Sequence, residues 1–399
     1  MTTLAEKWDI HPEHFWLRGR RADRPVRFDE TLGMWNVYGY PEALEVLNDH
    51  GTFSSDTARL FPVPVDGPLV EGDMGQLDPP EHRKLRTLVS HAFTPKIVAD
   101  LEPRITRLTH ELLDAVGDPG EVELMTELAY PLPVIVIAEL LGVPTSDRPL
   151  FQRWMDTMAE SMTDAQPSLA EDDVAQERAF QVTMEQMRQL LDYLREHAAE
   201  RRRRPRQDLL SQLVQAQADG ARLTDDQVVN FAKMLLIAGY LTTTMLLGNT
   251  VLCLDAHPDQ AALVRGDRSL VPTLIEESLR FLSPIAATYR VTTADVEIGG
   301  RRVPRDQMLM VWLAAANRDE RQFADPDVFV AARDPNPHLG FARGVHFCLG
   351  APLARLEVRI ALNILLDRYP RLRTDPDHPP TFMPAADTTG VSSLRLRTR

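Results

Sequence analysis

The chain has 399 residues, of which 44% are hydrophobic, and carries a formal net charge of -14. This apolar content is enough for one large core, and the acidic balance gives no reason to expect nucleic-acid binding. The two cysteines argue against a disulfide scaffold and the N-terminus shows no secretory signal, so we expect a cytoplasmic protein. The longest apolar stretch, residues 231–254, includes Lys233, Gly239 and Asn249, which favours a buried helix over a membrane span.

The N-terminal region combines a hairpin with a long irregular stretch. Residues 25–38 contain two short apolar runs around Gly33, which predicts a β-hairpin, and a helix is expected over 41–48. Residues 54–80 are rich in proline, glycine and aspartate and show no period. We therefore expect a long loop there, and loops of this length in compact proteins are usually functional.

Most of the remaining chain has helical periodicity. The run Thr224–Gln227 predicts a capping box that opens a long apolar helix ending near residue 255. A hairpin is expected over 296–304 and a strand over 308–313. The fold class is therefore mainly α with a small β region (α+β), in a single domain over 1–399 with β-rich parts near 25–40 and 284–312. Helices are predicted over 82–92, 95–116, 122–141, 147–162, 172–202, 207–218 and 271–282.

Cys348 lies in the run FARGVHFCLG, residues 341–350, directly before a helical segment in which Pro352 suits the first turn. Gly344 and Gly350 have no Cβ and let the backbone approach a flat cofactor closely. The amides at a helix N-terminus are expected to lower the pKa of a thiol and to suit a metal-bound thiolate. Cys253 lies in an apolar helical run and is interpreted as core filler.

The spacing Phe-x-x-Gly-x-His-x-Cys-x-Gly resembles the haem-binding loop of the cytochrome P-450 family, the haem-thiolate monooxygenases. The resemblance extends over almost the whole chain and implies the single triangular, mainly helical fold of that family. It implies that Cys348 is the axial ligand of haem b, with Phe341, His346 and Gly350 in the cofactor-binding loop.

The stretch AGYLTT, residues 238–243, resembles the oxygen-activation segment of the same family. Ala238, Gly239 and Thr242 share one helical face with Leu235, and a glycine inside a helix costs about 1 kcal/mol relative to alanine. Thr242 can hydrogen-bond the carbonyl of Ala238 and open a notch. The resemblance implies that the Thr242 hydroxyl hydrogen-bonds dioxygen; a threonine satisfied only by its own backbone is the alternative.

One residue departs from the family pattern. The family usually has an acidic residue immediately before this threonine, whereas this chain has Leu241. A leucine cannot relay a proton, so protons must arrive through ordered water, through Thr242 and Thr243, or through a polar group of the substrate. A substitution without mechanistic consequence is the other interpretation.

Two further groups of residues match the family. Glu277 and Arg280 have the spacing that brings a carboxylate and a guanidinium together on a helix, and with Arg333 they resemble the triad that supports the cysteine loop. The resemblance also implies four partners for the haem propionates. These are His82, Arg86, Arg290 and His346.

The resemblance implies a monooxygenase that inserts one atom of dioxygen into a small, largely apolar organic substrate, with electrons from a ferredoxin and its reductase. Arg343, Arg355 and Arg359 form a basic docking face or are ordinary solvated arginines. The alternatives are a peroxide-driven peroxygenase and a non-catalytic haem sensor. The substrate pocket is expected to include the loop 54–80, helices between 147 and 190, and Leu235, Ile285 and Ala286.

Overall fold

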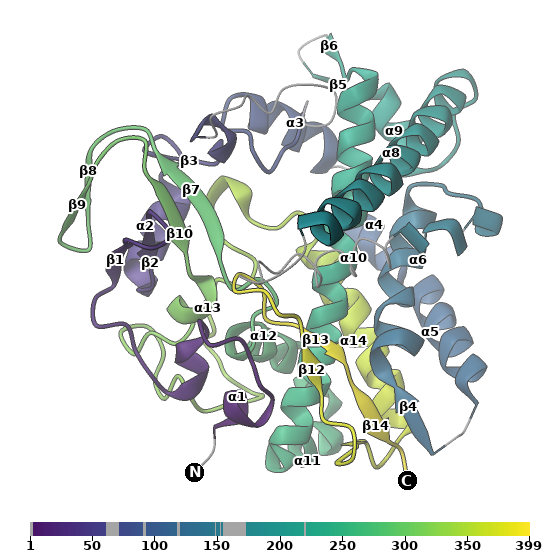
Figure 1. Ribbon diagram of the computed structural model, residues 1–399. Helices are drawn as coiled ribbons and strands as arrows, with labels where there is room; N and C mark the ends of the chain where they lie inside the picture. Colours follow the sequence, from purple (N-terminus) through teal and green to yellow (C-terminus); the bar gives the residue numbers. More distant parts are fainter. Residues whose placement is uncertain are drawn as a thin grey trace.

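A long apolar helix runs through the middle of the molecule (Figure 1). The computed structural model describes residues 3–60, 72–90, 93–117, 120–147, 149–151, 153–154, 173–218 and 221–399. The helix is α10 (Asp225–Ala256), and it opens on the predicted capping box between Thr224 and Gln227. It is long and apolar enough to cross a bilayer, but 72% of its most apolar window is buried inside the protein. It therefore serves as the core helix.

The other helices surround α10 and its neighbours. Within the described residues, α6, α8, α12 and α14 make the most extensive helix contacts with α10. A five-residue π-helical turn, Met125–Ala129, precedes α6. The remaining helices are α1 (Leu4–Lys7), α2 (Tyr40–Asn48), α3 (Glu81–Ser90), α4 (Pro95–Asp100), α5 (Glu102–Val116), α6 (Pro131–Leu140), α8 (Asp173–Arg203), α9 (Leu209–Gln215), α11 (Pro258–Gly266), α12 (Val271–Phe281), α13 (Leu313–Ala316) and α14 (Ala351–Arg368).

A five-stranded sheet lies to one side of α10, with strand order β1-β2-β10-β7-β3 (Figure 1). The predicted N-terminal hairpin forms its edge, and β10 joins that hairpin in parallel and β7 antiparallel. Its strands are β1 (Val26–Asp29), β2 (Met34–Val37), β3 (Phe53–Ser54), β7 (Thr288–Thr292) and β10 (Met308–Val311). The smaller sheets contain β4 (Glu121–Glu123), β5 (Gln217–Ala218), β6 (Ala221–Arg222), β8 (Val296–Ile298), β9 (Arg301–Val303), β11 (Arg373–Thr374), β12 (Thr381–Phe382), β13 (Val391–Ser393) and β14 (Arg395–Arg397).

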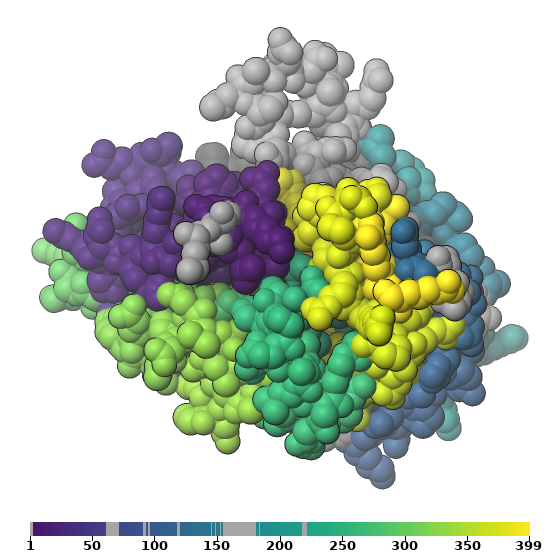
Figure 2. All heavy atoms as spheres, turned by 90° about the horizontal axis from the view of Figure 1, so that it is seen from below, coloured from purple at the N-terminus to yellow at the C-terminus, as the bar shows by residue number. Residues whose placement is uncertain are grey.

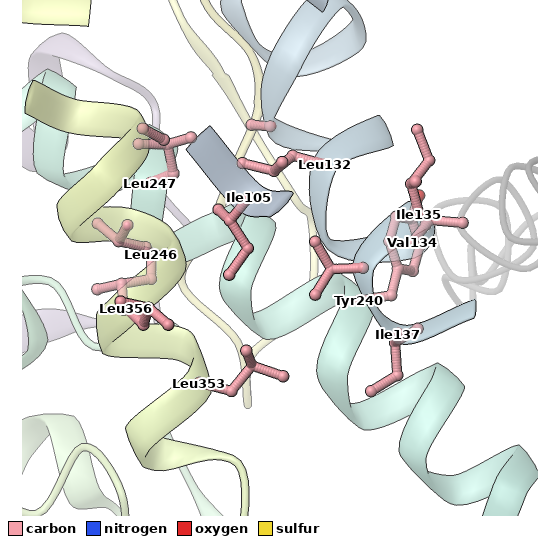
Figure 3. Close-up of a cluster of buried hydrophobic side chains, with 14 of the residues drawn as sticks. Ile105, Leu132, Val134, Ile135, Ile137, Tyr240, Leu246, Leu247, Leu353 and Leu356 are labelled. Atoms are coloured by element: carbon pink, nitrogen blue, oxygen red, sulfur yellow. The ribbon is translucent and has the colours of Figure 1, made fainter. Parts of the chain in front are cut away.

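The largest hydrophobic cluster includes residues from Ala5 to Leu396 and is organised around α10. Figure 3 shows part of it, where side chains of α5 (Ile105), α6 (Leu132), α10 (Leu246) and α14 (Leu353 and Leu356) gather in one cluster. Burial of these side chains fixes the position of α10 relative to α14, the helix that follows Cys348.

Some expectations differ from the structure. The helix predicted over 95–116 ends at residue 100 and restarts at Glu102, with Pro103 in the first turn of α5. The helix predicted over 122–141 begins instead as β4, because its residues pair with β14 near the C-terminus. The predicted helix 147–162 and the middle of the loop 54–80 lie largely outside the described residues.

Candidate active site

Cys348 lies in a tight loop directly before α14. The loop is closed by hydrogen bonds from Cys348 N to the carbonyl oxygen of Phe341, 3.0 Å, and from Phe347 N to that of Gly344, 3.1 Å. Gly344 has φ +70°, and a Cβ there would lie 2.2 Å from the carbonyl oxygen of Leu47 in α2. Gly344 is therefore required by packing against α2 and by its backbone conformation.

Gly350 has a different environment. Its φ is -80°, and apart from its neighbours along the chain a Cβ there would come no closer than 4.0 Å to a described atom, the nearest being Cys348 Sγ. The protein alone therefore leaves room for a side chain at this position. Residues 341–350 also remain at least partly exposed although helices and strands surround them. Both observations fit a loop that has a bound group on one side.

Burial raises the pKa of the Cys348 thiol above its ordinary value. The amides of Gly350 and Ala351 and the guanidinium groups of Arg86 and Arg355 act in the opposite direction but do not reverse the shift. The expectation of a lowered pKa was therefore wrong for the free thiol, because burial outweighs the helix N-terminus. A thiol that coordinates a metal ion is deprotonated by the ion itself.

Four basic side chains from three distant segments gather beside this loop. His82 and Arg86 come from α3, Arg290 from β7 and His346 from the loop itself. The rings of His82 and His346 have centroids 4.2 Å apart, and Arg86 Nη2 donates to the carbonyl oxygen of Phe347 at 2.5 Å. The structure therefore brings together the four residues expected at the haem propionates.

A described carboxylate, Asp78, acts on this basic cluster, but it offsets the effect of burial on the pKa of His82, Arg290 and His346 only in part. Nε2 of His82 and Nε2 of His346 are buried and have no hydrogen-bond partner among the described residues. Within the same part of the chain, no carboxylate forms an ion pair with Arg86 or Arg290. Burial lowers the pKa of Arg290 to about 10. The pKa of His346 is lowered to about 3, chiefly by burial and then by the nearby charges of Arg290 and His82. Because buried cations without an ion pair are costly, the cluster fits an anionic ligand such as two propionates.

The middle of α10 is open on one side. Ala238 is exposed, Gly239 and Thr242 are partly exposed, and residues 243–254 on the following turns are buried. Thr242 Oγ1 donates to the carbonyl oxygen of Ala238 at 2.7 Å, as the sequence predicted. A Cβ on Gly239 would meet only Ile137 at ordinary contact distance, 3.7 Å. The protein therefore leaves space beside this part of α10.

Other residues predicted for this region lie away from the opening. Thr243 is buried because each helical residue rotates the side chain by about 100°, and Leu241 packs against the main core. Leu235 is almost completely buried. Ala286 is 0% exposed within an aromatic cluster, whereas its neighbour Ile285 is partly exposed.

The three residues expected to support the loop form one buried network. Both carboxylate oxygens of Glu277 accept hydrogen bonds from Arg280, at 2.7 and 2.8 Å, and the Glu277 and Arg280 side chains are 0% exposed. Arg333 Nε reaches the same carboxylate at 3.1 Å. Arg280 also donates to the carbonyl oxygens of Pro326 and Val328. The network ties α12 to the long segment that leads to Cys348.

Two of the three arginines considered as a basic docking face, Arg355 and Arg359, are neutralised by carboxylates. Arg355 forms a bidentate pair with Glu276, at 2.6 and 2.7 Å, and its guanidinium lies 4.5 Å from the ring centroid of Phe341. Arg359 pairs with Glu102 at 2.8 Å. Both arginines therefore link α14 to a neighbouring helix, and the positive charge of each is paired with a carboxylate.

Several residues of this site were not predicted. Glu276 also contacts His338 Nε2 at 3.0 Å, and His338 Nδ1 accepts from Gly340 N, so Glu276 is linked to the segment before the cysteine loop. His14 Nε2 donates to the carbonyl oxygen of Ala386 at 2.7 Å. Figure 2 shows the N-terminal segment next to the C-terminal one. No local spacing indicates these contacts, because each joins residues distant in sequence.

Comparisons with known proteins decide the family. The family model for cytochrome P450 matches residues 27–393. The chain belongs to the cytochrome P450 family. Cyclomarin C epoxidase CymV of Salinispora arenicola is 43% identical over 387 residues, 97% of this chain and 96% of that protein. Erythromycin C-12 hydroxylase of Saccharopolyspora erythraea is 41% identical, over 94% and 93% of the two chains.

Solved structures of similar proteins support the same family assignment. The post-tailoring hydroxylase HmtN, involved in himastatin biosynthesis, is 63% identical with a TM-score of 0.90, and each chain is covered completely. HmtT, also involved in himastatin biosynthesis, is 60% identical with a TM-score of 0.90 and the same coverage. The predicted α+β P450 fold is therefore confirmed. As a P450 the chain binds haem b and is a monooxygenase that uses a small-molecule substrate, dioxygen and electrons from redox partners.

Proposed function

We propose that this cytochrome P450 carries out a late oxidation in secondary metabolism, inserting one oxygen atom into a preassembled, largely apolar natural product. The observation that carries the site assignment is the buried cluster of His82, Arg86, Arg290 and His346, which has no ion-paired carboxylate among the described residues and lies directly beside the loop of Cys348. On this proposal Cys348 is the axial ligand, and the four basic side chains neutralise the propionates.

The substrate class is supported by the names of the relatives. They describe an epoxidase of cyclomarin C, a hydroxylase of erythromycin at C-12 and a post-tailoring hydroxylase of himastatin biosynthesis. Each of these names links the protein to the oxidation or biosynthesis of a particular natural product. We propose that the enzyme works in the cytoplasm and receives electrons from a ferredoxin and ferredoxin reductase.

The roles of the residues follow from their contacts. The haem, when bound, supplies dioxygen activation, which electron donation from the Cys348 thiolate favours. The Thr242 hydroxyl already donates to Ala238 and is left with acceptor capacity, so it can hold a water molecule at the opening. Leu241 offers no proton. Protons therefore have to pass along water held by Thr242 or from a polar group of the substrate.

The assignment is tested by the reduced carbon monoxide spectrum of the holoprotein. Wild type should show the red-shifted Soret band of thiolate-ligated iron, and Cys348→His should lose it. Cys253→Ala is the matched control, because Cys253 is buried in α10 and should leave the band unchanged. A red-shifted band that survives in Cys348→His would refute the ligand assignment. A screen of natural products for the water-displacing Soret shift, followed by product analysis, then tests the substrate class.

Leu241 favours one second candidate, a peroxygenase that uses hydrogen peroxide directly. The two functions differ in their electron source. Turnover with peroxide, and none with any ferredoxin system, would establish the peroxygenase and exclude the monooxygenase cycle.

A further inference from the structure

A second charged network, separate from that of Glu277, is centred on the preceding residue of α12, Glu276. Both Glu276 carboxylate oxygens accept hydrogen bonds from Arg355 of α14, at 2.6 and 2.7 Å, and Oε2 also contacts His338 Nε2 at 3.0 Å. Because His338 Nδ1 accepts from Gly340 N at 3.0 Å, Nε2 carries the ring hydrogen and donates to Glu276. The carboxylate therefore joins α12, α14 and the segment before the cysteine loop.

Arg355 also contacts the cysteine loop itself. Its Cζ lies 4.5 Å from the ring centroid of Phe341, and the carbonyl oxygen of Phe341 accepts from Cys348 N at 3.0 Å. Burial has the largest effect on the pKa of the Cys348 thiol and raises it, whereas the positive charge of Arg355 lowers it. Arg355 is therefore packed against the residue that closes the loop, and its charge acts on the Cys348 sulfur.

Glu276 opposes that charge. Burial alone would raise the pKa of Glu276, but the hydrogen bonds from Arg355 and His338 outweigh it and lower the pKa to about 2. Glu276 is therefore ionised at neutral pH, in direct contact with the Arg355 guanidinium. The side chains of Glu276 and Arg355 are 27% and 36% exposed, so solvent screens their charges only in part.

The next turn of α14 carries a comparable ion pair. Arg359 donates to Glu102 of α5 at 2.8 Å, and these side chains are 37% and 47% exposed. Both pairs link α14 to a neighbouring helix, but the described contacts of the Arg359 pair do not include the cysteine loop. A role confined to holding helices together would make the two pairs equivalent.

We propose that Glu276 and Arg355 set the reduction potential of the iron bound to Cys348, with Arg355 raising the potential and Glu276 limiting that increase. A positive charge near the sulfur favours the reduced state, which carries one more electron, and a negative charge disfavours it. Both are positioning residues, because they act through the cysteine loop, and His338 holds Glu276 in place. The proposal rests on Cys348 as the ligand, which the carbon monoxide band tests separately.

The test is a reductive titration of the substrate-free holoprotein with redox mediators, followed by the Soret band. Arg355→Gln should make reduction about threefold less favourable in its equilibrium constant, and Glu276→Gln should make it more favourable by a similar factor. Threefold is about 30 mV, because tenfold corresponds to about 59 mV for one electron. The double variant Glu276→Gln/Arg355→Gln loses one charge of each sign and should return close to the wild-type potential.

Conservative and matched variants separate this electrostatic role from a structural one. Arg355→Lys keeps the charge but loses the planar two-pronged contact, so its potential should stay closer to wild type than that of Arg355→Gln. Arg359→Gln and Glu102→Gln are the controls, because they break the comparable pair, and they should leave the potential unchanged.

Every variant is first checked for the carbon monoxide band of thiolate-ligated iron. Shifts of the same sign in Glu276→Gln and Arg355→Gln, or shifts no larger than those of the two controls, would overturn the proposal. If Arg355→Gln does not retain haem, Glu276→Gln decides the question alone. A wild-type potential in Glu276→Gln would then overturn the proposal, and a raised one would support it.

Discussion

Replacing Glu277 by glutamine tests the network that supports the cysteine loop. The Glu277 carboxylate is 0% exposed and accepts hydrogen bonds from Arg280 at 2.7 and 2.8 Å, from Arg333 at 3.1 Å and from Val330 N at 2.9 Å. The glutamine side chain keeps the shape but leaves two guanidinium groups without their counter-charge. Breaking a buried ion pair in this way costs about 3–5 kcal/mol.

The measurement is thermal unfolding of the ferric holoprotein, followed by circular dichroism and by the Soret band. Each kcal/mol shifts the midpoint by about 2–4 °C in chains of 150–250 residues and by less in a longer one, so a decrease of roughly 5 °C is expected. The control is Asp295→Asn, which removes an exposed pair with Arg302 whose side chains are 52% and 81% exposed. That control should show no measurable shift. Equal midpoints for Glu277→Gln and Asp295→Asn would refute the reasoning.

Three further predictions concern single residues. Arg290→Gln should lower haem occupancy or shift the reduction potential, because a propionate loses its charged partner; unchanged pyridine haemochrome content and potential would contradict this. Leu241→Glu should increase the product formed per reduced nicotinamide with poor substrates, because a carboxylate can relay a proton, and equal coupling in both proteins would exclude a role for this position. Burial raises the pKa of Glu357 from 4.5 to about 8, so the folded protein keeps a proton that the unfolded chain releases. Stability should therefore fall as pH rises between these values, and urea unfolding of Glu357→Gln should lack that part of the pH dependence.

The parts of the site that the sequence predicted are those whose geometry is local. The hydrogen bond from Thr242 to Ala238 and the pair between Glu277 and Arg280 depend only on helical spacing. The capping box at Thr224 is local in the same way. The family resemblance also predicted Cys348 and the four basic residues as one site, although no periodicity in the sequence would have brought them together.

The remaining features depend on segments distant in sequence. Residues 121–123 form a strand only because β14 lies beside them, and Ala286 is enclosed by aromatic residues of the N-terminal region. Burial by surrounding elements also set the direction of the Cys348 pKa, which the helix N-terminus alone would have lowered.

His14 joins the two ends of the chain to the core helix. Its Nε2 donates to the carbonyl oxygen of Ala386 at 2.7 Å, and its Nδ1 accepts from the Thr389 hydroxyl at 3.2 Å. Asn249 of α10 donates to the carbonyl oxygen of the same Thr389 at 2.7 Å. The N-terminal segment is thus coupled to α10 through the C-terminal one, so a change near residue 14 would be transmitted to the helix that carries Thr242.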